Sequence, residues 1–178
     1  MLALFLCGCS GNVDSTKDVL SLRQQLLSGN GCSFLAEITA DYGDVLYEFT
    51  LDCVADQMGN LSFTVVKPER ISGITGKIDQ IDGCLTFDDQ VLLFDTLNEE
   101  QLSPVSAPYI FLKTLRSGYI SGCGKDGELA FWRMDDSYRD SAYQLEIWAD
   151  DTNIPVRAEI LWKGRRILSI SVKEFRIL

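Results

Sequence analysis

Apolar and polar residues alternate along the chain from Cys32 to Cys53, on both sides of a turn at Asp41-Tyr42-Gly43-Asp44. This period of two predicts an antiparallel hairpin with one buried face. With Asp41 opposite Asp44, Cys32 lies opposite Cys53. A two-residue loop places their Cα atoms roughly 4.5 Å apart, which a disulfide can just span. A four-residue loop, which avoids positive φ at Tyr42, keeps these pairs but changes their hydrogen-bond class.

Short alternating runs continue through most of the chain. Turn residues bound each run, as is typical of strands. Besides the hairpin, we expect strands at 61–65, 71–78, 85–87, 91–94, 119–123, 128–134, 142–149, 155–162 and 166–177.

Two stretches lack this alternation and predict helices. The first starts at Asp14 or Ser15 as a cap and runs to Leu27, ahead of a glycine-rich stop. The second starts at Ser103 or Ser106, has prolines near its start and ends before Gly118. About ten to eleven short strands with two helices indicate an antiparallel α+β domain.

The composition fits one domain and excludes several functions. The 178 residues are 46% hydrophobic, enough for a real core. The net charge of −10 should repel nucleic acid. The chain has no histidine, which removes the usual general base, metal ligand and Ser-His or Cys-His nucleophile systems.

Paired carboxylates are the remaining candidates for catalysis or calcium binding. They occur at Asp88-Asp89, Glu99-Glu100, Asp135-Asp136 and Asp150-Asp151. Most fall in predicted turns, where aspartate is favoured for bonding to the local backbone. We therefore expect solvated turns, no metal and no cofactor.

The amino terminus resembles the end of a secretory signal followed by a lipid-attachment motif, Leu6-Cys7-Gly8-Cys9. The apolar stretch is too short to span a bilayer. We assign residues 1–9 to a signal-peptide remnant with Cys9 as the lipidated residue, 10–17 to a tether and 18–178 to a single domain. The protein is then expected on the extracytoplasmic face of the cell membrane, held there by its lipid.

Four cysteines remain after Cys7 and Cys9 are set aside, and they allow three pairings. The predicted hairpin register selects Cys32–Cys53 and leaves Cys84 with Cys123 by elimination. Zinc is disfavoured because no two of the four lie close together in sequence, as zinc ligands normally do.

Several segments carry a family resemblance: Phe63-Thr-Val-Val-Lys-Pro68, Ile71-Ser-Gly-Ile-Thr-Gly76, Leu85-Thr-Phe-Asp88, Leu102-Ser-Pro, Leu115-Arg-Ser-Gly-Tyr-Ile120 and Pro155-Val-Arg-Ala-Glu-Ile160. Over roughly 30–178 the chain resembles the LolA and LolB lipoprotein-carrier superfamily, and within it the GerS-type germination lipoproteins. The resemblance implies an open, strongly curved half-barrel with helices covering its concave apolar face. It supplies no catalytic residues.

The resemblance leaves two functions open, both non-catalytic. A carrier would hold acyl chains or another apolar ligand on the concave face, whereas a GerS-type protein is a membrane-anchored partner of a spore-cortex amidase. We expect large rings to fill the concave face, which favours a protein partner such as a cell-wall amidase. A carboxylate-dependent hydrolase is a weaker third reading. The expected rings are Phe34, Phe49, Phe63, Phe87, Phe111, Trp148 and Trp162.

Overall fold

The structure is a computed structural model that describes residues 12–41, 43, 45–79, 83–87, 90–94, 103–139 and 142–178. For 12–14, 83, 86, 87 and 90–94 it describes the backbone alone. The strands are β1 (Gly31–Asp41), β2 (Leu46–Asp56), β3 (Leu61–Lys67), β4 (Thr75–Ile78), β5 (Gly83–Phe87), β6 (Gln90–Phe94), β7 (Tyr119–Asp126), β8 (Leu129–Asp135), β9 (Gln144–Ala149), β10 (Pro155–Trp162) and β11 (Arg165–Ile177). The helices are α1 (Asn12–Ser28), α2 (Ala107–Ser117) and the short 3₁₀ turns η1 (Glu69–Ile71) and η2 (Pro104–Ser106).

All eleven described strands form one antiparallel sheet, in the order β6-β5-β4-β3-β2-β1-β11-β10-β9-β8-β7. Neighbouring strands follow one another in sequence except at the centre, where the last strand pairs with the first. The strands at the two ends of this order, β6 and β7, do not pair with each other, so the sheet stays open. The predicted open antiparallel α+β architecture is confirmed.

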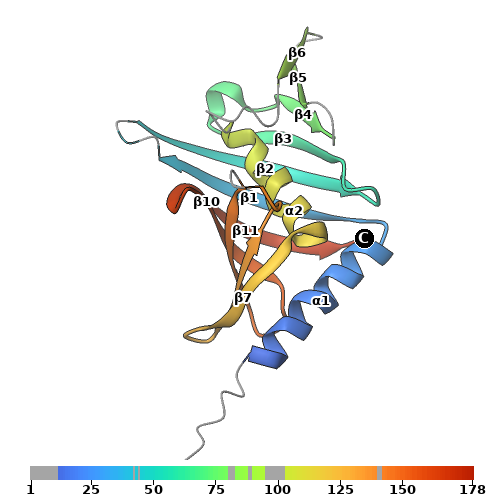
Figure 1. Cartoon of the computed structure of the whole chain (residues 1–178). Helices are drawn as coiled ribbons and strands as arrows, with labels where there is room; N and C mark the ends of the chain where they lie inside the picture. Colours follow the sequence, from blue (N-terminus) through green and yellow to red (C-terminus); the bar gives the residue numbers. More distant parts are fainter. Residues whose placement is uncertain are drawn as a thin grey trace, which may run out of the picture.

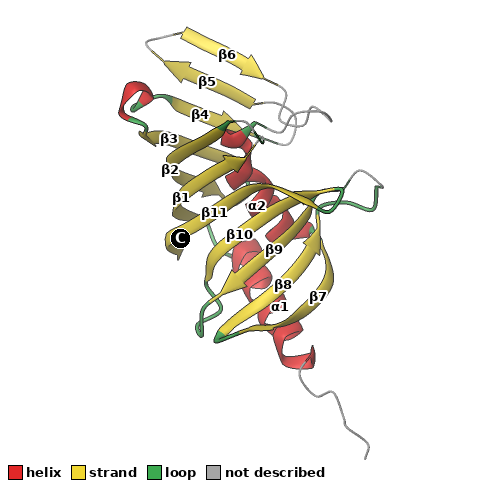
Figure 2. Cartoon of the chain, turned by 90° about the vertical axis from the view of Figure 1, so that its left-hand side faces the viewer, coloured by secondary structure: helices red, strands yellow, loops and turns green. Residues whose placement is uncertain are grey.

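Both long helices lie on the same side of the sheet (Figures 1 and 2). We call the side that they cover the inner face and the opposite side the outer face. Helix α1 contacts β7 and β8, and α2 contacts β8, β10 and β11. The two helices also contact each other. The inner face is therefore the site of the core.

Strand β1 shows why this face is buried. Cys32, Phe34, Ala36, Ile38 and Ala40 point to the inner face and are at most 2% exposed. The residues between them are half-buried and polar apart from Leu35. Because the apolar side chains alternate with the polar ones, all of them reach the same face. Their burial stabilises the fold by roughly 25 cal/mol for each Å² of apolar surface removed from water.

The hairpin register differs from the predicted one by two residues. Cys32 pairs with Ala55, Cys53 pairs with Phe34, and Asp41 pairs with Leu46. The loop has four residues, and the Asp41 carboxylate accepts a hydrogen bond from the Gly43 N–H at 2.8 Å. Gly43 has a φ of +92°, which glycine adopts without strain. Placing the strand ends at Asp41 and Leu46 moves every pair by two positions and keeps every side chain on its predicted face.

Two other boundaries differ from the prediction. Helix α1 begins at Asn12, so residues 12–17, which we assigned to a tether, are helical. The strand expected over 71–78 is shortened to Thr75–Ile78, because η1 occupies the residues after Pro68. Pro68 has no N–H to donate to a ladder, which fits its place just beyond β3.

Candidate functional site

Aromatic rings fill the middle of the inner face. The Phe34 ring packs edge-on against Phe111 of α2, with centroids 5.8 Å apart, and stacks on Phe175 at 5.7 Å. Phe34, Phe111 and Trp132 are all at most 2% exposed. These contacts hold α2 against the sheet.

The predicted rings are not all on this face. Phe34, Phe63 and Phe111 are buried in the inner-face core, while Phe49 and Trp162 are half-buried against it. The side chain of Phe87 lies outside the described residues. Trp132, which we had not included, is wholly buried in the core.

Trp148 corrects the prediction, because it lies on the outer face. In β9 the inner-face residue is Ile147, which pairs with Ala158 and Trp132 of the core. The next side chain must point the other way. Trp148 is still only 7% exposed, since Phe131 and Arg157 cover its ring.

Arg23 of α1 binds the carboxyl-terminal end of α2. Its Nε donates to the Leu115 carbonyl at 2.8 Å, and its guanidinium also donates to the carbonyls of Gly118 at 2.7 Å and Thr114 at 3.4 Å. The last carbonyls of a helix have no partner within the helix, and they attract a cation. Burial lowers the pKa of Arg23, but an arginine remains charged at neutral pH.

Arg116 of α2 makes the reciprocal contact. Its guanidinium donates to the Leu26 carbonyl near the end of α1 at 2.7 Å and to the Gln57 carbonyl of the β2–β3 turn at 2.8 Å. Gly59 of this turn has a φ of +89°, and a Cβ there would lie 2.9 Å from the Arg116 Nε. Each helix thus supplies the cation that caps the other, and we call these two residues the arginine clamp.

Three buried polar atoms have no hydrogen-bond partner among the described residues: Ser106 Oγ, Thr114 Oγ1 and Trp132 Nε1. All three residues are 0% exposed. Ser106 and Thr114 belong to η2 and α2, and Trp132 belongs to the inner face of β8. Buried polar groups in proteins are nearly always satisfied, so each unpaired one calls for a water, a ligand or another physical reason.

Some apolar side chains at the border of the core are only half-buried. Five of them belong to β2, η1, the segment that follows η1, β5 and η2, and η2 contacts β1 and β2. No side chain caps the start of η2 or α2. We call this group the apolar margin; it consists of Phe49, Ile71, Ile74, Leu85 and Val105.

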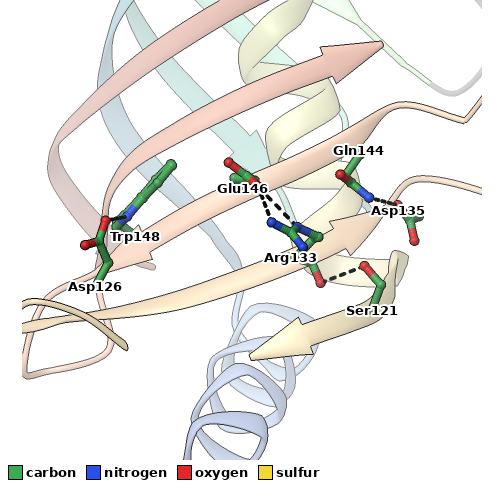
Figure 3. Close-up of polar contacts among 7 residues, drawn as sticks. All are labelled: Ser121, Asp126, Arg133, Asp135, Gln144, Glu146 and Trp148. Carbon is green, nitrogen blue, oxygen red and sulfur yellow. Dashed lines mark hydrogen bonds and ion pairs between the residues drawn. The ribbon is translucent and has the colours of Figure 1, made fainter. Parts of the chain in front are cut away.

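The outer face carries an ordered set of polar contacts over β7, β8 and β9 (Figure 3). Arg133 binds the Glu146 carboxylate through Nε at 3.1 Å and through a terminal nitrogen at 2.7 Å. The Trp148 indole N–H donates to Asp126 at 2.8 Å. Arg133 and Glu146 are a cross-strand pair of β8 and β9, so the sheet register fixes the geometry of their contact.

A groove of about 820 Å³ lies on the outer face. It crosses β2, β1, β11 and β10, and the segment that follows β3 forms one wall. Most of its lining residues are polar or charged. They are Glu37, Ile38, Thr39, Glu48, Phe49, Thr50, Lys67, Pro68, Glu69, Leu129, Val156, Arg157, Ser169, Ile170 and Ser171.

The cysteines do not form the predicted disulfides. Cys32, Cys53, Cys84 and Cys123 are free thiols. Cys32 and Cys53 are diagonal neighbours in the hairpin, because Cys32 pairs with Ala55 and Cys53 pairs with Phe34. Burial raises the pKa of Cys32 to about 11, against a smaller opposing effect of Arg116, and burial also raises the pKa of Cys53. Cys9 lies outside the described residues.

The acidic pairs that the structure describes serve turns. The Asp150 carboxylate accepts hydrogen bonds from the N–H groups of Thr152 at 2.9 Å and Ile154 at 3.0 Å, and Asp136 accepts one from the Tyr143 N–H at 2.9 Å. The pairs at 88–89 and 99–100 lie outside the described residues. Within the described part of the chain, no group of three or more acidic or cysteine residues could hold a metal ion. None of the described helices is long and apolar enough to cross a membrane.

Comparison with known proteins identifies the fold and nothing finer. No family model and no curated protein matches the chain. A LolA superfamily protein of Nitrosomonas europaea has a similar structure, with a TM-score of 0.51 and 7% identity over 92% of this chain and 93% of that one. A putative outer membrane lipoprotein-sorting protein domain of Vibrio parahaemolyticus has a TM-score of 0.52 and 11% identity over 92% and 93%. An uncharacterised conserved protein of Thermus thermophilus has a TM-score of 0.51 and 15% identity over 92% and 88%. The chain therefore has a LolA-type fold.

Proposed function

We propose that this protein is a non-catalytic, extracytoplasmic binding protein that takes up an acyl chain or another apolar ligand on its inner face. The LolA-type fold supports this proposal, since it places one large apolar sheet face beneath two helices. The sequence supports the absence of catalysis, because it contains no histidine. A binding role needs an apolar surface that closes over the ligand and no catalytic group.

The observation that carries the proposal is the set of unpaired polar atoms inside this apolar face. Ser106 Oγ, Thr114 Oγ1 and Trp132 Nε1 offer hydrogen-bond partners to a polar group that enters the core. An acyl chain carries such a group at one end. Its hydrocarbon would lie along the apolar margin, and its carboxyl or ester group would satisfy one or more of these atoms.

Access to the inner face is expected at the amino-terminal end of α2. The arginine clamp holds the carboxyl-terminal ends of α1 and α2, through Arg116 and Arg23. The start of α2 has no side-chain cap, and it follows the half-buried Val105. A small outward movement of this end would expose more of the apolar margin while leaving the clamp intact.

A fatty-acid probe whose fluorescence rises in apolar surroundings tests this proposal. We expect saturable binding of cis-parinaric acid, and displacement of the probe by palmitate. Val105→Glu puts a charge in the apolar margin and should weaken binding at least tenfold. The matched control is Val54→Glu, on the outer face of β2, where the side chain is 47% exposed. Equal weakening by both variants, or no binding at all, would refute the proposal.

A second candidate is a protein partner, which the filled centre of the inner face favours. The rings of Phe34 and Phe111 leave less room there than an empty carrier would need. The tip of the β1–β2 hairpin also presents exposed apolar side chains at Val45, Leu46 and Tyr47. A GerS-like role beside a cell-wall amidase rests on sequence resemblance alone. Co-purification of an amidase with the wild-type protein, lost in Leu46→Asp, would support it.

Membrane anchoring through Cys9 belongs to the same proposal. One acyl chain binds membranes only marginally, whereas two or more hold firmly. The full-length protein made with its natural upstream sequence should carry a diacylglyceryl mass on Cys9 and partition into detergent. If Cys9→Ala remained equally membrane-bound, lipid attachment at this position would be ruled out.

A further inference from the structure

The groove on the outer face has a volume of about 820 Å³ and is lined by polar groups of the strands that carry the core on their other side. We propose that this groove binds a neutral, hydroxyl-rich ligand, namely a short oligosaccharide. Phe49 borders both this groove and the apolar margin, but the polar groups proposed to bind the sugar belong to the groove alone.

Two cross-strand rows form the floor. In one row Glu37 pairs with Thr50 on one side and with Ser171 on the other. In the second, Thr39 pairs with Glu48 and with Ser169. Cross-strand neighbours on one face lie roughly 4.5–5.5 Å apart. The small side chains between the longer ones leave the hollow and line it with hydroxyl groups.

Hydroxyl and carboxylate groups at this spacing match the hydrogen-bonding groups of a sugar. A serine or threonine hydroxyl both donates and accepts, while a carboxylate accepts. Sugar hydroxyls also do both, so each can pair with two neighbours in the rows. On β1, the outer-face residues Glu37 and Thr39 are two positions apart, which separates the two rows by roughly 7 Å.

Arg157 supplies fixed donors at one side of the groove. Its guanidinium lies 4.4 Å from the centroid of the Trp148 ring, and it pairs with the buried Glu159. The Trp148 indole is itself held by Asp126 at 2.8 Å. Arg166 also binds Glu159 at 3.0 Å, which keeps that carboxylate in place. Arg157 is therefore positioned before a ligand arrives, which reduces the entropy lost on binding.

The charges and hydroxyl groups of the groove disfavour anionic and apolar ligands. Three carboxylates and two cations line the groove, so an anionic ligand would meet more repulsion than attraction. An apolar ligand would leave the floor hydroxyls without water or partner. Glu37 is already paired with Lys173 at 2.7 Å. A volume of about 820 Å³ lies within the roughly 300–1,000 Å³ of small-ligand sites.

Titration with chitotriose and maltotriose, followed by amide chemical-shift changes in the full chain, tests the proposal. We expect saturable changes that map to β1, β2, β10 and β11. Thr39→Val removes one floor hydroxyl with little change of shape, and should weaken binding about three- to tenfold, as expected for the loss of one hydrogen bond. The matched control is Thr64→Val, at an exposed position of β3 outside the groove, which should bind like the wild type.

Three results would overturn the proposal. The first is no saturable change with either sugar at millimolar concentration. The second is a set of shift changes that maps to other strands. Equal weakening of sugar binding by Thr39→Val and Thr64→Val, with the wild-type melting temperature retained in both, would count in the same way. The third is saturable binding of trilysine in place of the sugars, which would make the groove a peptide site. Val105→Glu should leave sugar binding unchanged, so failure of the apolar site and failure of this one are distinguishable.

Discussion

The arginine clamp makes a quantitative prediction about how the helices are held on the sheet. Replacing Arg23 with methionine keeps most of the apolar stem and removes every hydrogen bond of the guanidinium. Two of these bonds are short, at 2.7 and 2.8 Å, and all of them end on carbonyls at or just past the end of α2. Hydrogen bonds to a charged group contribute about 1.5–3 kcal/mol, and a cation at a helix end adds about 0.3–1 kcal/mol.

We therefore expect Arg23→Met to lower the free energy of unfolding by about 3 kcal/mol. For a protein of this size each kcal/mol corresponds to roughly 2–4 °C in melting temperature. Arg116→Met should lower the free energy of unfolding less, by about 1–2 kcal/mol, because one of its two acceptors lies in the exposed β2–β3 turn. Urea unfolding followed by tryptophan fluorescence measures both.

The double variant tests whether the two arginines act as one device. If each holds α1 and α2 together, the loss in Arg23→Met/Arg116→Met should be smaller than the sum of the single losses. Arg70→Met, in the exposed turn η1, is the control for removing a guanidinium without a clamp. Our reasoning fails if Arg23→Met is no more destabilised than Arg70→Met, or if the two losses simply add.

Three further predictions test the strand packing, the register and a turn. Gly76→Ala should destabilise by about 1–3 kcal/mol in thermal unfolding, because its Cβ would lie 2.2 Å from the Phe63 ring; at Gly122 the nearest atom would be 3.8 Å away, so Gly122→Ala should be near neutral. Cys32 and Cys53 should resist alkylation in the folded protein and react after denaturation, and a Cys32–Cys53 cross-linked peptide in non-reducing mapping would contradict the register. Burial alone would raise the pKa of Asp56, but hydrogen bonds from Asn60, Met58 and Gly59 outweigh it and lower that pKa. The stability that these bonds contribute is present above the unfolded pKa of about 3.9 and is lost as the pH falls through the lower folded value, so Asp56→Asn should unfold less steeply with acid than the wild type.

The sequence predicted the inner face well because alternation is a local signal. Every inner residue of β1 from Cys32 to Ala40 was identified, and so was the turn that follows. The register was not, because a shift of two residues leaves the same side chains on the same faces. Only the loop between Asp41 and Leu46 distinguishes the two registers, and the hydrophobic pattern does not predict the conformation of that loop.

The misplaced tryptophan has a related cause. Ile147, Trp148 and Ala149 are all buried, so the apolar run conceals which residue faces the helices. Burial of Trp148 comes from Phe131 and Arg157 on other strands. The face of such a residue can be assigned only when the residues on the adjacent strands are known.

The candidate sites depend still more on distant contacts. Arg23 and Leu115 are far apart in the chain, and no local pattern marks either as half of a clamp. The outer groove combines residues from Glu37 to Ser171, none of which forms a recognisable motif. The sequence therefore predicted an apolar face and a fold class, whereas the polar sites emerge only from the assembled sheet.

Native mass spectrometry of the protein, purified gently from its own host, tests the central claim most directly. The account predicts a stoichiometric mass increment that is released by organic solvent and identified as an acyl lipid, and that is reduced in Val105→Glu but kept in Val54→Glu. A protein that carries no lipid and is recovered in a defined complex with a cell-wall amidase would contradict the account and establish the partner function in its place.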